Sequence, residues 1–239
     1  TDVPGQGYRL VEEWDLDRTL YPDAEVLAAE LNAQGFAWFA YFNTFVVEGT
    51  RVHAAAKGKH LIKDATGADY SFSGVTFTPT SLVDLDSDAA REFMLGYLDA
   101  ALQVGFDGWM ADYGEWLPHD AVLADGRSAL QVHNLYPLQW AELNQTALRR
   151  RAQDGKQRLF FSRAGALGSN ASTPVVWAGD QRTSFQKDDG LYTVVPLGLG
   201  LGLGGVSTFG SDVAGYQSAT NPPSTKELFF RWTTLGALT

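Results

Sequence analysis

The chain of 239 residues carries a net charge of −10, with 45% hydrophobic and 19% charged residues. This composition predicts a folded core, and the acidic balance argues against nucleic acid or an anionic membrane as a partner. The lack of cysteine excludes disulfides and thiolate metal sites, and no apolar run is long enough to span a bilayer.

Strand patterns alternate with helical patterns along the chain. A helix is predicted over 21–35, with Pro22 near its start and Gly35 past its end, and the apolar strand 35–43 follows it. Helical patterns over 86–105 and 137–155 precede strands at 105–112 and 158–165. Further strands are predicted at 173–180 and 204–212, and a last helix from about Ser224.

The stretch PLGLGLGLGG at 196–205 alternates leucine and glycine. We interpret it as a helix whose glycines allow close packing on the sheet, because a crossover is needed between the fourth and fifth strands. It does not have the glycine spacing of a nucleotide-binding loop.

Repeated strand and helix units predict an α/β fold with a parallel sheet. Each strand is apolar almost throughout, as expected when helices cover both faces. A (β/α)8 barrel gathers polar residues at the carboxyl ends of its strands, but five strands do not close a barrel, so either strands have been missed or the chain is a fragment. A doubly wound sheet would gather polar residues at the same strand ends.

Polar residues follow the strands directly, and two of them are aspartates preceded by aromatic residues. Trp109 and Met110 precede Asp112, and Trp177 precedes Asp180. Each aspartate alone fits a helix cap or an ion pair. Together, with Arg163 on the strand between them, they favour a carbohydrate site in which rings stack on sugars and two carboxyl groups share the chemistry.

The motifs GFDGWMADYGEWLP, HNLYPLQW, RAG, WAGD and SDVAGY resemble those of glycoside hydrolase family 31 in order and spacing. The resemblance covers nearly the whole chain. It implies a partial (β/α)8 TIM barrel, about strands three to seven, with residues 1–239 as one partial catalytic domain of a longer enzyme. It implies Asp112 as the nucleophile and Asp180 as the general acid/base of a retaining mechanism, with their carboxyl groups about 5–5.5 Å apart. It also implies that the substrate contacts Trp109, Met110, Arg163 and Trp177, and that Asp212 supports the sugar subsite.

Two features resemble the branch of this family that cleaves α-sulfoquinovosides such as sulfoquinovosyl glycerol. Tyr216 ends the SDVAGY motif, and Arg9 lies in GYRLVEEWDLDRTLYP; both are implied to hold the sulfonate. Glu12 stands where the branch carries a tryptophan, and a carboxylate repels a sulfonate. Either Trp14 supplies the ring, or the substrate differs.

Other functions remain as alternatives. An α-glucosidase of the same family and an inactive carbohydrate-binding relative both fit the motifs. A sugar-phosphate isomerase or aldolase is disfavoured, because no lysine lies at a strand end. No cofactor is expected, and no metal, since His53 and His60 have no carboxylate at ligand spacing. The expected partner is a small glycoside; a homo-oligomer stays open, and the cytoplasm is the expected compartment.

Overall fold

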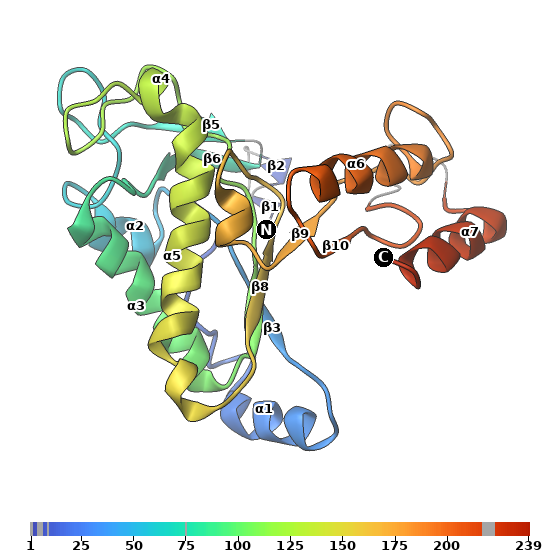
Figure 1. Cartoon of the computed structure of the whole chain (residues 1–239). Coiled ribbons are helices and arrows are strands. Elements are labelled where there is room, and N and C mark those ends of the chain that lie inside the picture. Colours follow the sequence, from blue (N-terminus) through green and yellow to red (C-terminus); the bar gives the residue numbers. More distant parts are fainter. Residues whose placement is uncertain (1, 4–6, 9, 75, 217–222) are drawn as a thin grey trace. The chain divides into compact units, whose positions relative to one another are not determined.

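The computed structural model describes residues 2–3, 7–8, 10–74, 76–216 and 223–239 (Figure 1). The chain divides into two compact units. The first comprises residues 1–160 and 164–169, and the second comprises residues 161–163 and 170–239.

Five parallel strands confirm the predicted α/β fold. Their order in the sheet is β10-β9-β8-β7-β3, so neighbours in the sheet also follow one another along the chain within this set of five. All five lie inside the predicted strand ranges: β3 (Phe39–Phe42), β7 (Gly108–Ala111), β8 (Leu159–Ser162), β9 (Val175–Trp177) and β10 (Phe209–Gly210).

The predicted helices are also present, as α1 (Ala24–Ala33), α3 (Asp88–Val104), α5 (Tyr136–Arg150), α6 (Leu191–Leu203) and α7 (Lys226–Gly236). The side chains of Ser87 and Thr225 accept backbone N–H bonds at the starts of α3 and α7. Gly105 ends α3 in the left-handed conformation, with φ +113°.

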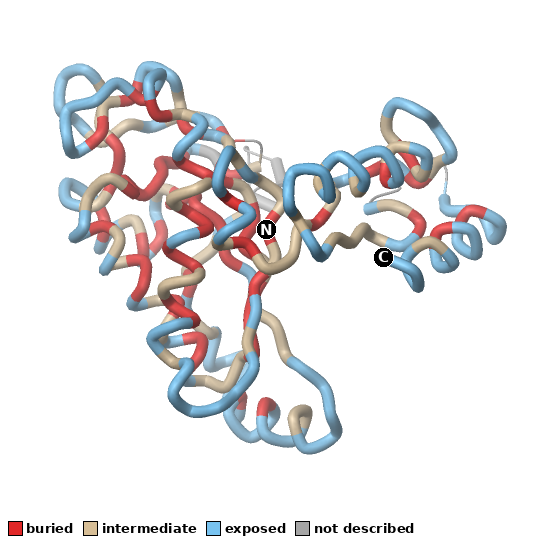
Figure 2. Tube along the Cα trace, viewed as in Figure 1, coloured by how far each residue is buried: buried red, intermediate tan, exposed pale blue. Residues whose placement is uncertain are grey.

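The core of the first unit lies between its helices and strands. Buried residues gather along α3, α5 and β7 (Figure 2), and α3 packs against both α1 and α5. Gly108 at the start of β7 is required by close approach: a Cβ there would lie 1.7 Å from the carbonyl oxygen of Leu159. Only glycine allows these two strands to meet at this point.

A three-stranded antiparallel sheet, formed by residues that lie between β3 and α3 in the sequence, was not predicted. It has the order β4-β6-β5, formed by β4 (Phe45–Val47), β5 (Phe72–Gly74) and β6 (Phe77–Leu82). The remaining short elements are β1 (Asp2–Val3), β2 (Gly7–Tyr8), α2 (Arg51–Ala56), α4 (Ala129–Val132), and the 3₁₀ turns η1 (His133–Leu135), η2 (Ala152–Asp154) and η3 (Ser169–Ala171).

The second unit has its own small core. Val194 of α6 and Leu228 and Trp232 of α7 form a buried cluster against which Phe209 of β10 packs. Gly198 confirms the interpretation of the leucine–glycine stretch, since a Cβ there would lie 3.0 Å from the Phe209 ring. Gly200 and Gly202 face open space, so close packing explains only one of the glycines.

Candidate active site

Asp112 directly follows β7 and is 6% exposed. Residues i and i+2 of a strand share a face, so Asp112 lies on the face of Met110, and Trp109 and Ala111 lie on the other. Oδ2 of Asp112 accepts a hydrogen bond of 2.6 Å from the Tyr41 hydroxyl, and Oδ1 accepts one of 2.9 Å from the Tyr113 backbone N–H. The bonds from β3 and from the following turn restrain the rotation of the Asp112 side chain.

The chain turns sharply after Asp112. Tyr113 has φ +58° and Gly114 has φ +110°, so two consecutive residues adopt left-handed conformations. The Tyr113 ring packs edge-on against Phe45 and Phe77 of the small antiparallel sheet, with centroids 4.8 and 5.6 Å away. This sheet therefore supports the turn that carries the Tyr113 N–H toward Asp112, and tertiary packing offsets the cost of the non-glycine left-handed residue.

A line of polar residues runs from Asp112 across β3. Asn43 shares a strand face with Tyr41, and its Nδ2 donates to Glu12 Oε2 at 2.7 Å. The Asn43 oxygen accepts the Phe45 backbone N–H at 2.9 Å, which sets the orientation of the amide. Burial raises the pKa of Glu12 to about 7; the hydrogen bond from Asn43 lowers it, and the charge of Asp112 raises it further.

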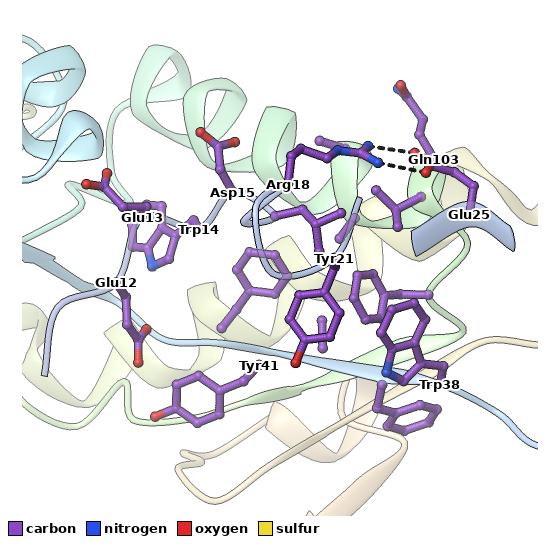
Figure 3. Close-up of a pocket in the computed structure, with 18 of the residues that line it drawn as sticks. Glu12, Glu13, Trp14, Asp15, Arg18, Tyr21, Glu25, Trp38, Tyr41 and Gln103 are labelled. Carbon is purple, nitrogen blue, oxygen red and sulfur yellow. Dashed lines mark hydrogen bonds and ion pairs between the residues drawn. The ribbon is translucent and has the colours of Figure 1, made fainter. Parts of the chain in front are cut away.

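Glu12 and Tyr41 also line a pocket of about 800 Å³ in the first unit. Figure 3 shows their polar ends at the same end of this pocket, away from the ion pair between Arg18 and Glu25 at 2.6 Å. Trp14 is 9% exposed and packs edge-on against Tyr97 of α3, with centroids 5.6 Å apart. Glu12, rather than the Trp14 ring, therefore lies beside Tyr41.

The second unit brings together four of the predicted residues. Trp177 ends β9, and its ring contacts Tyr216 with centroids 6.2 Å apart. The Tyr216 backbone N–H donates to the Gln181 carbonyl at 2.9 Å, next to Asp180. Burial raises the pKa of Asp212; the Trp177 indole lowers it, and the charge of Asp180 raises it. Trp177, Asp180, Asp212 and Tyr216 thus form one cluster around the ends of β9 and β10.

The other predicted residues have different placements. Arg163 directly follows β8, and Met110 lies on the same strand face as Asp112. Trp109 corrects our expectation of a substrate contact: it is fully buried, and its indole N–H donates to Asn144 of α5 at 2.6 Å. It joins β7 to α5. Arg9 lies outside the described residues.

Sequence reasoning missed Tyr41 as a neighbour of Asp112. The signal was present in the alternation of the predicted strand 35–43, because Tyr41 lies two residues before Asn43 at the end of that strand and so shares its face. What could not be read was the register that aligns Tyr41 with Met110 and so places its hydroxyl at Asp112.

The described residues contain neither a metal-binding cluster nor a membrane-spanning helix. Within the described ranges, no three His, Asp or Glu side chains are grouped so that they could hold a metal ion. None of the described helices has both the length and the apolar character needed to cross a membrane.

Residues 3–239 match the model of the glycosyl hydrolases family 31 TIM-barrel domain. The match covers nearly all of the chain and agrees with the parallel α/β fold. The chain therefore belongs to glycoside hydrolase family 31, the family that its motifs resemble.

Several individual proteins of known activity are similar to this chain over most of its length. The sulfoquinovosidases of Escherichia coli and Agrobacterium fabrum are 35% and 36% identical to this chain, each over 98% of it. A solved family 31 sulfoquinovosidase from E. rectale covers 95% of the chain at 34% identity with a TM-score of 0.88. An α-xylosidase of Emericella nidulans is 25% identical over 95% of the chain. The chain spans 34% and 35% of the lengths of the two sulfoquinovosidases and 34% of the solved one.

Proposed function

We propose that this chain forms the central part of a retaining α-glycosidase that hydrolyses α-sulfoquinovosides. The observation that carries the chemistry is the buried carboxylate of Asp112 at the end of β7, whose oxygens accept hydrogen bonds from the Tyr41 hydroxyl and the Tyr113 backbone N–H. The support for the substrate is the identity of 35% and 36% to sulfoquinovosidases over 98% of the chain.

The proposed reaction has two steps. The Asp112 carboxylate attacks the anomeric carbon while protonated Asp180 gives its proton to the departing glycosidic oxygen, so the aglycone leaves as an alcohol. A glycosyl ester to Asp112 remains. Asp180, now a carboxylate, removes a proton from water, the water oxygen attacks the same carbon, and the ester bond breaks. Two inversions give retention.

The residue cluster of the second unit suits the role of general acid/base and sugar subsite. Trp177 and Tyr216 supply rings on which a sugar can pack, and Asp212 and Asp180 interact electrostatically. In the proposal Arg163 and Met110 also contact the sugar, and Arg9 with Tyr216 receives the sulfonate. The small-molecule glycoside as partner and the cytoplasm as compartment stay predictions of the same proposal.

Glu12 favours a second candidate, an α-glucosidase of the same family. An ionised Glu12 beside an anionic sulfonate is repulsive, whereas it can accept hydrogen bonds from the hydroxyls of an uncharged sugar. The pKa of Glu12, raised by burial to about 7, allows a neutral carboxyl at mildly acidic pH, which removes the repulsion. The two candidates therefore differ in which substrate the full-length protein prefers.

The test compares 4-nitrophenyl α-sulfoquinovoside with 4-nitrophenyl α-glucoside on the full-length protein. We expect cleavage of the sulfonated substrate to be faster, and Asp112→Asn to abolish it. Asp180→Asn should lose far more activity on sulfoquinovosyl glycerol than on the nitrophenyl glycoside, because nitrophenolate leaves without a proton. The control is Asp88→Asn in the exposed first turn of α3, which should keep its activity.

Three other outcomes would each overturn part of the proposed function. Faster cleavage of the plain glucoside would replace the sulfonate assignment with the α-glucosidase. Sugar binding without cleavage of either substrate would identify an inactive relative. Full activity of Asp112→Asn would overturn the nucleophile assignment.

A further inference from the structure

Tyr41 and Asp112 form the shortest described link between the neighbouring strands β3 and β7 at their carboxyl ends. The strands are parallel, with Tyr41 paired to Met110 and Phe42 to Ala111, and the Asp112 N–H donates to the Phe42 carbonyl at 2.8 Å. This register brings the Tyr41 hydroxyl to 2.6 Å from Asp112 Oδ2. Backbone pairing thus sets the position of the hydroxyl before any substrate arrives.

The hydroxyl of Tyr41 can act only as a donor to Asp112. Burial raises the pKa of Tyr41 above its ordinary value, and the charge of Asp112, the hydrogen bond to Asp112 and the charge of Glu12 act in the same direction, while Asn43 acts against them. The phenol therefore stays protonated across the working range of an enzyme. A donor at this distance restrains rotation of the Asp112 side chain.

We propose that Tyr41 is a positioning residue of the glycosidase reaction, which holds the Asp112 carboxylate aimed for attack on the anomeric carbon. This inference rests on the proposed function, because it assumes that Asp112 is the nucleophile. The Tyr113 N–H donates to Oδ1 and the Tyr41 hydroxyl donates to Oδ2, so the turn after β7 and the strand β3 both contribute to the orientation of the carboxylate.

The test is Tyr41→Phe in the full-length protein. The change removes the hydroxyl and keeps the ring, so packing in the pocket is retained. Hydrogen bonds to charged groups predict a fall in kcat of about 10-fold to 100-fold with a much smaller change in KM.

Tyr70→Phe is the matched control. The Tyr70 hydroxyl donates to Asp120 Oδ1, also at 2.6 Å, but this pair lies outside the candidate site. Its loss should leave kcat, KM and the pH profile unchanged. If Tyr41→Phe raises KM as much as it lowers kcat and the melting temperature falls in parallel, the hydroxyl acts on the fold alone and the proposal is overturned.

Asp112→Asn separates this inference from the proposed function. An inactive Asp112→Asn together with a fully active Tyr41→Phe would overturn only the role of Tyr41. An active Asp112→Asn would overturn the nucleophile assignment itself, whatever Tyr41→Phe does. A loss of activity in Asp112→Asn, together with a lower kcat and a nearly unchanged KM in Tyr41→Phe, is the expected result.

Discussion

The buried environment of Glu12 does not suit a charged side chain. Its carboxyl is held by Asn43 at 2.7 Å and lies near the charge of Asp112, within the same polar line as Tyr41. The pKa of Glu12, raised by burial to about 7 from the model-peptide value of 4.5, means that the folded protein holds this proton more tightly than the unfolded chain. The stability contributed by the protonated form is therefore complete below about pH 4.5 and is lost as the pH rises to about 7.

Glu12→Gln should stabilise the protein at pH 8 and leave it unchanged near pH 4.5. A neutral amide removes the cost of a buried charge, and its oxygen can still accept from Asn43. The raised pKa corresponds to up to about 3 kcal/mol at pH 8. The measurement is the melting temperature of both proteins at the two pH values; an equal gain at both would show that ionisation of Glu12 is not responsible.

At the scale of elements, the approach of β8 to β7 depends on Gly108. A side chain there would meet the Leu159 carbonyl, and the backbone has φ +156°. Gly108→Ala should therefore destabilise the protein by about 3 kcal/mol or more. Gly96→Ala is the matched control: Gly96 is exposed within α3 with nothing near its Cβ position, and alanine should raise stability by about 1 kcal/mol. Melting temperatures that fall equally in both variants would contradict the close approach.

The elements also show what the sequence could and could not predict. Periodicity located all five parallel strands and their helices, because their strands are apolar runs and their helices carry clear boundary residues such as Gly35 and Gly105. The sheet β4-β6-β5 was missed, since the strand signal in Phe72 and Phe77 is interrupted by Gly74 and Pro79. Its loss from the prediction matters, because this sheet packs against Tyr113 beside Asp112.

The positions of residues at the ends of strands were predicted correctly, whereas the direction in which a side chain points was not. Asp112 and Asp180 follow their strands as expected. In the motif, Trp109 was interpreted as a residue that contacts the sugar. It lies three positions before Asp112 and therefore on the opposite face of the strand, where it contacts α5. Tyr41 became visible only once the register of β3 against β7 was known.

At the scale of the whole molecule, the chain is one part of a larger family 31 fold, covering 34% of the E. coli relative. Its proposed activity depends on Asp112 forming a covalent bond to the sugar. A ring-fluorinated α-sulfoquinovosyl fluoride tests this most directly, because fluorine on the ring slows hydrolysis of the glycosyl ester and allows it to accumulate.

The measurement is mass spectrometry of peptides from the full-length protein after reaction with that reagent. We predict that the added sugar mass is found on Asp112, in the peptide that contains GFDGWMADYGEW, and that Asp112→Asn abolishes the labelling. A sugar bound to any other residue, or turnover of sulfoquinovosides with inversion and no labelled peptide, would contradict the account.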